Sequence, residues 1–89
     1  MKPYKEKIIS NYIKLRYFSS DTNPDDLKWH YDEEDRVVSV MSETDWQFQF
    51  DNKLPINMKE DIIIPKGVMH RLIKGNTDLN ITIKSIVLN

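Results

Sequence analysis

The sequence predicts a small all-β domain built as a sandwich or a barrel of short strands. Apolar and polar residues alternate with a period of two in several short stretches. Clusters of Asp, Asn, Ser, Pro and Gly, which favour turns, separate these stretches. The chain has 89 residues, a length that suits one domain with one modest core. We therefore expect residues 1–89 to form a single domain, with its core between about residues 12 and 86.

The alternating stretches follow one another along the chain. In residues 12–18, three apolar residues alternate with Lys14 and Arg16, and in residues 36–41 Val38 and Val40 have the same parity. Residues 46–50 show the clearest pattern, because three aromatic residues alternate with two glutamines. Residues 5–10 are open to either a short amphipathic helix or another structure. We expect strands at residues 12–18, 36–41, 46–50, 62–64 and 79–84, and a last one at residues 86–88.

The expected corners lie between these strands. The chain has two glycines, so its turns depend mainly on Asp, Asn and Pro. Such residues cluster at residues 19–26, 51–55, 65–67 and 75–78. Short strands joined by turns of this kind indicate a sandwich or a barrel.

Composition and charge argue against several classes of function. The net charge is −1 and no dense basic stripe is present, so we expect no duplex nucleic acid as a partner. Without cysteine there is no disulfide framework and no thiolate ligand, and two glycines are too few for a phosphate-binding loop. Residues 1–7 are charged, and no run approaches the ~20 apolar residues that span a bilayer. We expect a soluble, cytoplasmic protein with no membrane partner.

Two motifs carry a resemblance to a known family. Residues 65–70 have the pattern P-x-G-x-x-H, which resembles the second motif of the cupin superfamily, where a tight turn delivers a histidine into a barrel. His30-Tyr31-Asp32 resembles the approach to the first cupin motif, which has the form H-x-H, a short gap and a glutamate. Asp32 stands where that motif has its second histidine, and Arg36 stands at the glutamate position. The resemblance, over roughly residues 12–86, implies a small cupin-like double-stranded β-helix (jelly-roll) barrel.

The resemblance leaves two functions open. In the first, the barrel binds a small anionic ligand, such as a nucleotide, without turnover and without a cofactor. An arginine suits phosphate or carboxylate, histidines supply adaptable donors, and aromatic rings stack on bases. The candidate ligand-binding residues are Trp29, His30, Tyr31, Arg36, His70, Arg71 and Lys74.

The alternative is a small metal-dependent cupin enzyme of the isomerase or dioxygenase type. Two histidines and one carboxylate, namely His30, Asp32 and His70, can hold a divalent transition metal. Arg36 opposes this alternative, because a guanidinium repels a dication unless a carboxylate neutralises it. If Asp32 does so, we expect it to be lost as a ligand.

A further resemblance concerns residues 29–36 and 46–50, which are similar to those of very short cupin-like proteins of tailed phages. It implies a homo-oligomeric phage protein in the host cytoplasm, a sponge that sequesters the cyclic-nucleotide signals of host immunity. Purely structural interpretations also exist. Arg36 can pair with Glu34 or Asp35 on the surface, Trp29 can serve only in packing, and a structural interaction domain would bind neither ligand nor metal.

Overall fold

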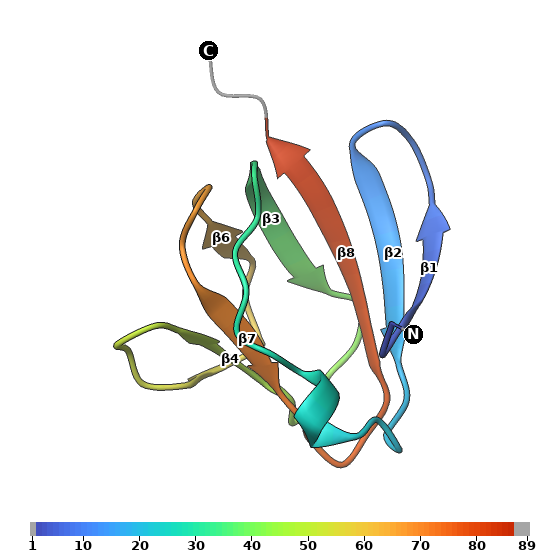
Figure 1. The fold of residues 1–89 in the computed structure, drawn as a ribbon. Coiled ribbons are helices and arrows are strands. Elements are labelled where there is room, and N and C mark those ends of the chain that lie inside the picture. Colours follow the sequence, from blue (N-terminus) through green and yellow to red (C-terminus); the bar gives the residue numbers. More distant parts are fainter. Residues whose placement is uncertain (1, 87–89) are drawn as a thin grey trace.

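The computed structural model describes residues 2–86 and consists of two antiparallel sheets that face each other (Figure 1). The larger sheet has the strand order β1-β2-β8-β3-β6, and the smaller one has the order β5-β4-β7. One 3-10 helix, η1, spans Pro24–Asp26. The strands are β1 (Lys5–Ile8), β2 (Ile13–Phe18), β3 (Asp35–Val40), β4 (Gln47–Phe50), β5 (Ile56–Asn57), β6 (Ile62–Ile64), β7 (His70–Ile73) and β8 (Leu79–Ile86).

The predicted all-β class is confirmed, and each predicted strand within residues 2–86 is present. Of the last predicted strand, only Ile86 is described, as the end of β8, while residues 87 and 88 lie outside the described part of the chain. In these same residues, 2–86, no helix has the length and apolar character that crossing a membrane requires.

The helical alternative for residues 5–10 is wrong, because Lys5–Ile8 forms strand β1 and pairs with β2. The apolar side of such a helix would have contained Ile8 and Ile9, which are 60% and 50% exposed. No tertiary packing therefore favours the helix, whereas strand pairing satisfies backbone groups that would otherwise lie at a sheet edge.

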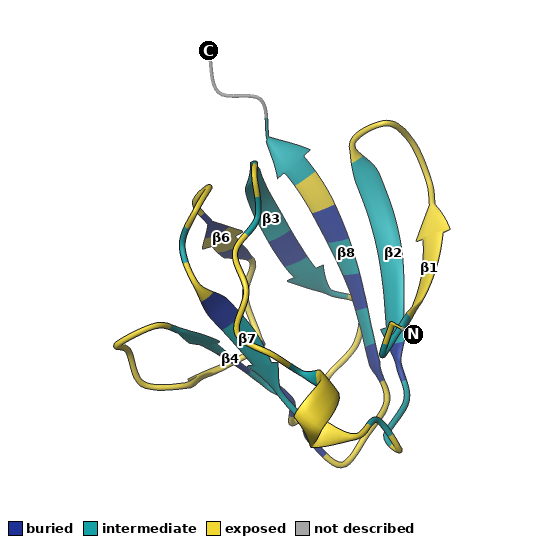
Figure 2. Cartoon of the chain, in the orientation of Figure 1, coloured by how far each residue is buried: buried dark blue, intermediate teal, exposed yellow. Residues whose placement is uncertain are grey.

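The core lies between the two sheets (Figure 2). Trp46 is fully buried and packs against Phe18, with ring centroids 5.6 Å apart. Strand β8 contributes alternate residues, as a sheet with one covered face requires. The buried cluster consists of Phe18, Val38, Trp46, Phe48, Met58, Ile62, Ile64, Leu79, Ile81 and Ile83.

Strand β2 turns its charged residues toward the interior. Arg16 lies opposite the buried Ile81 of β8, and Lys14 lies opposite the buried Ile83. Directly opposed residues of antiparallel strands have their side chains on the same face. The apolar residues that alternate with them, such as Leu15, therefore lie on the outer face of the large sheet. An arginine thus enters the space between the sheets.

The tight turn that the P-x-G-x-x-H pattern predicts is present before β7. Gly67 has a φ of 78°, a region that residues with a Cβ rarely adopt. Its N–H donates to the carbonyl of Asp32 at 2.9 Å, and the N–H of Lys66 donates to Oδ1 of Asp35 at 2.7 Å. These bonds fasten the segment before β3 to the turn before β7, although the two are far apart in the sequence.

Candidate functional site

Backbone pairing brings the two histidines of the chain together. The N–H of each donates to the carbonyl of the other, His30 to His70 at 3.0 Å and His70 to His30 at 2.9 Å. The segment containing His30 therefore extends the small sheet beside β7. Because the two residues are directly opposed, their side chains lie on one face, and the ring centroids are 4.3 Å apart.

Asp32 completes a cluster of three potential metal ligands. One ligand atom from each of His30, Asp32 and His70 can be chosen so that all lie within 4.8 Å of one another. His70 is 4% exposed, and its ring stacks on Phe48 with centroids 5.4 Å apart. The Asp32 side chain is 10% exposed. The cluster therefore lies mostly away from solvent, except for His30, which is exposed.

Hydrogen bonds to the backbone fix the tautomer of both rings. Nδ1 of His70 lies 2.8 Å from the carbonyl oxygen of Val68, and Nδ1 of His30 lies 3.0 Å from that of Lys28. A carbonyl oxygen only accepts, so each Nδ1 donates its hydrogen and leaves Nε2 with a lone pair in the neutral ring. Metal-binding histidines are commonly held by this kind of Nδ1–H bond.

One carboxylate oxygen in the cluster is buried without a hydrogen bond to residues 2–86. This atom, Oδ2 of Asp32, lies 3.3 Å from Nε2 of His70. Burial, above all, lowers the pKa of His70, so we take the ring as neutral at neutral pH. Two lone pairs then face each other across this short distance. Such an arrangement is unfavourable unless a proton or a cation lies between the two atoms.

Arg36 adds a positive charge, which two carboxylates offset. Its Nη1 lies 3.2 Å from Oδ1 of Asp32, and its Nε lies 3.1 Å from Oε1 of Glu34. A hydrogen bond from the hydroxyl of Ser85, together with Arg36, lowers the pKa of Glu34. With two negative charges and one positive charge, this group has a net charge of −1. Arg36 binds Oδ1 and leaves Oδ2 of Asp32 free, so the pair does not remove Asp32 as a ligand.

The residues present therefore fit a divalent transition metal. Two imidazole nitrogens and one carboxylate oxygen are the donor set of the facial triad that holds non-haem iron. The buried and unpaired oxygen of Asp32 and the two fixed tautomers are observations on this chain that match such a set. The predicted surface pairing of Arg36 is only partly seen, because Arg36 contacts Glu34 but its side chain is just 15% exposed.

The cluster opens into a cavity of about 410 Å³ between the two sheets, within the range of small-molecule sites. Its apolar lining comes from both sheets, with Phe18, Val38, Ile64, Ile81 and Ile83 from one and Phe48 and Leu72 from the other. The cationic side chains at the cavity are Lys2, Arg16, Lys28 and Arg36, and the acidic ones are Asp26 and Asp32.

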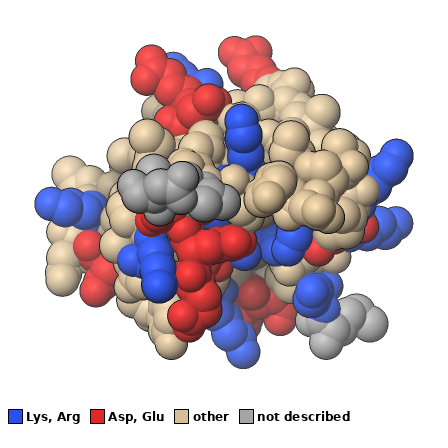
Figure 3. Space-filling view, turned by 90° about the horizontal axis from the view of Figure 1, so that it is seen from above, with Lys and Arg blue, Asp and Glu red and all other residues tan. Residues whose placement is uncertain are grey.

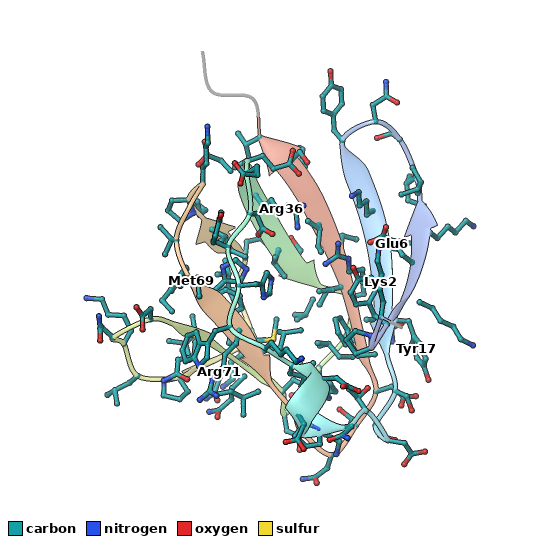
Figure 4. All side chains as sticks on the ribbon, in the orientation of Figure 1. Lys2, Glu6, Tyr17, Arg36, Met69 and Arg71 are labelled. Atoms are coloured by element: carbon teal, nitrogen blue, oxygen red, sulfur yellow. The ribbon has the colours of Figure 1, made fainter. Side chains whose placement is uncertain are left out.

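The predicted ligand-binding residues fall into two groups. His30, Arg36 and His70 line the cavity, but Trp29, Tyr31, Arg71 and Lys74 do not. The guanidinium of Arg71 lies over the Trp29 ring, with Cζ 4.5 Å from the centroid. Figure 4 shows Arg36 between the sheets and Arg71 on the other side of β7. The first group can therefore contact one ligand together, and a role of the second group in ligand binding stays a prediction.

A second polar group at the cavity was not predicted from the sequence. Lys2, Tyr4 and Arg16 line it from β2 and from the segment before β1, and Lys28 lines it from the segment after η1. In the alternating pattern of residues 13–18, Arg16 stands between apolar residues, so the pattern gave no reason to place it in a cavity. Phe18 has the same parity as Arg16 and is the one sequence signal that this face points inward.

Comparison with solved structures defines the fold. One similar structure is that of an RmlC-like cupin family protein with a double-stranded β-helix fold, from Methanocaldococcus jannaschii. The alignment covers 96% of this chain and 82% of that protein, with a TM-score of 0.66 and 13% sequence identity. A second is a cupin-2 domain containing protein from Shewanella frigidimarina. The alignment covers 89% of this chain and 76% of that protein, with a TM-score of 0.61 and 24% sequence identity.

A third similar structure is that of FeII HppE, an iron(II) protein by its name. The alignment covers 93% of this chain and 48% of that protein, with a TM-score of 0.64 and 15% sequence identity. No protein-family model matches the sequence, and no curated protein sequence matches it. At identities this low, structural likeness shows the fold and does not extend to activity.

The chain thus has the fold of a small cupin, a double-stranded β-helix, as its two motifs predict. Within it lies a His-Asp-His cluster suited to a metal ion. No comparison bears on a phage origin or on the sequestration of nucleotides, so both stay predictions.

Proposed function

We propose that this protein is a metal-dependent cupin in which His30, Asp32 and His70 hold a divalent transition metal beside a ligand cavity. The observation that carries the proposal is the buried Oδ2 of Asp32, which faces Nε2 of His70 without a hydrogen bond. A bound cation would resolve this contact, because it would accept both lone pairs at once.

The remaining residues of the site support this arrangement. The carbonyls of Val68 and Lys28 orient the two rings, and Phe48 packs flat against His70. Arg36 holds Asp32 through Oδ1 and is itself held by Glu34. Orienting contacts of this kind commonly change metal affinity by about 10–100-fold when they are removed.

The reaction class that fits is the isomerase or dioxygenase type that the cupin resemblance implies. When bound, the metal would supply a Lewis acid, or a redox centre if it is iron, for a substrate in the cavity. The chain's own contribution is to enclose that substrate between two sheets lined mostly by aliphatic and aromatic residues, which exclude water. The iron(II) form of a structurally similar protein supports the choice of metal class.

Elemental analysis of protein purified without chelator tests the proposal. We expect about one transition metal ion per chain in the wild type and in Asp61→Asn, which changes an exposed carboxylate outside the cluster. We expect its loss in His70→Ala. A wild-type protein that stays metal-free after incubation with Fe²⁺, Mn²⁺, Zn²⁺ and Ni²⁺ would contradict the proposal.

A second candidate is the non-catalytic binding of a small anion, including a cyclic nucleotide. It is supported by the cationic side chains at the cavity, of which Lys2, Arg16 and Lys28 lie outside the metal cluster. Acidic and basic side chains lie next to one another on the end of the molecule seen in Figure 3, so we expect a small anion rather than a polyanion. Calorimetry with a panel of cyclic dinucleotides and metal-free protein separates the candidates, because only the second predicts heat.

A further inference from the structure

The cavity has a second charged group, which the proposed metal centre does not use. Arg16 lines the cavity from β2, with Nε 2.6 Å from Oε2 of Glu6. Its guanidinium lies over the ring of Tyr4, with Cζ 4.2 Å from the centroid. Because the ring and the carboxylate hold the guanidinium from two directions, its position is fixed before any ligand arrives.

The terminal nitrogens of Arg16 are available to a ligand. Within residues 2–86, only Nε of Arg16 makes a hydrogen bond, to Glu6. Burial alone would raise the pKa of Glu6, but the hydrogen bond and the charge of Arg16 outweigh it and lower that pKa. Glu6 is therefore charged, and it occupies the Nε edge of the planar Arg16 guanidinium. The other edge, with both terminal nitrogens, keeps donors for a planar anion.

Arg16 and the metal cluster lie at opposite ends of the cavity. Arg16 is opposite Ile81 on β8, whereas Arg36, which contacts Asp32, is opposite Ser85. Four residues along a strand correspond to about 13 Å, and the two strand spacings between β2 and β3 add about 10 Å across the sheet. Figure 4 shows Lys2 and Glu6 on the β1–β2 side of this space and Arg36 on the β3 side.

Between these ends the cavity is lined by apolar side chains. Ile81 and Ile83 of β8 face Phe48 and Leu72 of the small sheet, with Phe18 beside Arg16. A ligand that spans the cavity would therefore bury an apolar middle part. A sugar or a polyphosphate would place polar atoms there without partners, at a cost.

We propose that Arg16 binds the carboxylate of an amphipathic organic acid, whose apolar body lies along the cavity and whose other end points toward His30, Asp32 and His70. The inference rests on the proposed function in taking the cluster as the reacting end, but the Arg16 subsite does not itself need the metal. Lys2 and Lys28 add positive charge at the cavity, and Asp26 offsets part of it.

Calorimetric titration of chelator-treated protein with octanoate tests the subsite. We expect saturable binding of one octanoate per chain, and no binding of octanol at the same concentration. Arg16→Gln should weaken octanoate binding by about tenfold to a hundredfold, as loss of a hydrogen-bonded charge does. Lys59→Gln is the matched control, since it removes one positive charge from an exposed residue that does not line the cavity, and it should bind as the wild type does.

Three results would overturn the inference: no octanoate binding, equal binding by Arg16→Gln, or tighter binding of octyl phosphate or AMP than of octanoate. If Arg16→Gln unfolds, Arg16→Lys keeps the charge without the fork and should still bind at least threefold more weakly. A failure of the proposed metal centre can be distinguished from a failure of the Arg16 subsite. Octanoate binding that depends on Arg16, in a protein that never takes up metal, would support the subsite and contradict the metal centre.

Discussion

Replacing Asp32 with asparagine should stabilise the metal-free protein while removing its response to metal. In the wild type, Oδ2 of Asp32 faces Nε2 of His70 at 3.3 Å without a hydrogen bond. An asparagine amide in the same place can donate to that nitrogen, because the Nδ1–H of His70 is already used by Val68. One substitution thus replaces the buried atom that has no partner by a donor and removes an anionic metal ligand.

The size of the effect follows from two opposing contributions. A buried polar atom without a partner costs about 1–3 kcal/mol, which the new hydrogen bond would recover. The ion pair between Arg36 and Oδ1 is lost, which costs about 1 kcal/mol because the two side chains are not fully buried. The net gain is about 1 kcal/mol, or a rise in Tm of about 4–8 °C for a chain of this length.

Thermal unfolding followed by circular dichroism, with chelator and then with excess Zn²⁺, measures both parts of the prediction. Wild-type protein should gain about 2.7 kcal/mol at a metal concentration one hundred times Kd, whereas Asp32→Asn should gain far less. A variant that is less stable than the wild type in chelator and still responds fully to Zn²⁺ would refute the reasoning about Oδ2.

Phe48→Ala should lower the free energy of unfolding in urea by about 3–5 kcal/mol, because Phe48 is 2% exposed beneath the His70 ring. A loss below about 1 kcal/mol would place it outside the core. Gly67→Ala should cost about 1–2 kcal/mol because its φ is 78°. Gly75→Ala should cost more, since its Cβ would lie 2.7 Å from the backbone nitrogen of Trp46; equal costs in urea would contradict this close approach. Backbone N–H donors lower the pKa of Asp45. Its stabilisation is therefore complete above the unfolded pKa of about 4 and falls away as the pH drops through the lower folded value. Urea unfolding between about pH 2 and pH 7 should show a flatter acid limb for Asp45→Asn, and unchanged profiles would contradict it.

Local patterns in the sequence predict the strands and the turn before β7. Alternation identified β2, β3, β4 and β8, and a short apolar run identified β6. The P-x-G-x-x-H pattern predicted the tight turn in which Gly67 has a φ of 78°. These features depend on a few neighbouring residues, so a single sequence contains enough information to find them.

The two faces of the strands could be predicted only in part. Once His30 is taken to point inward, its neighbours Trp29 and Tyr31 must point outward, because successive residues of an extended chain alternate. The same reasoning places Arg71 opposite to His70. The sequence already contains this alternation, which sets Trp29 and Arg71 on the face opposite to the two histidines.

Other features depend on contacts between distant segments. Arg16 faces the cavity because β2 pairs with β8 in a register that sets it opposite Ile81. Glu6 pairs with Arg16 only because residues 5–8 form strand β1 beside β2. The sequence of residues 5–10 did not reveal this strand, because its weak amphipathic pattern was equally consistent with a helix. Likewise, Asp32 keeps one oxygen free because Arg36 approaches the other, a detail of side-chain geometry that no spacing reveals.

Imidazole ¹⁵N spectra of His30 and His70, recorded before and after one equivalent of Zn²⁺, test the metal centre most directly. In the metal-free protein at pH 7.5, we expect Nδ1 of both rings to be protonated and Nε2 to be bare, as the bonds to Lys28 and Val68 require. Zn²⁺ should shift both Nε2 resonances and leave both Nδ1 nitrogens protonated. Spectra in which Zn²⁺ moves neither Nε2 signal would contradict a metal site at this cluster.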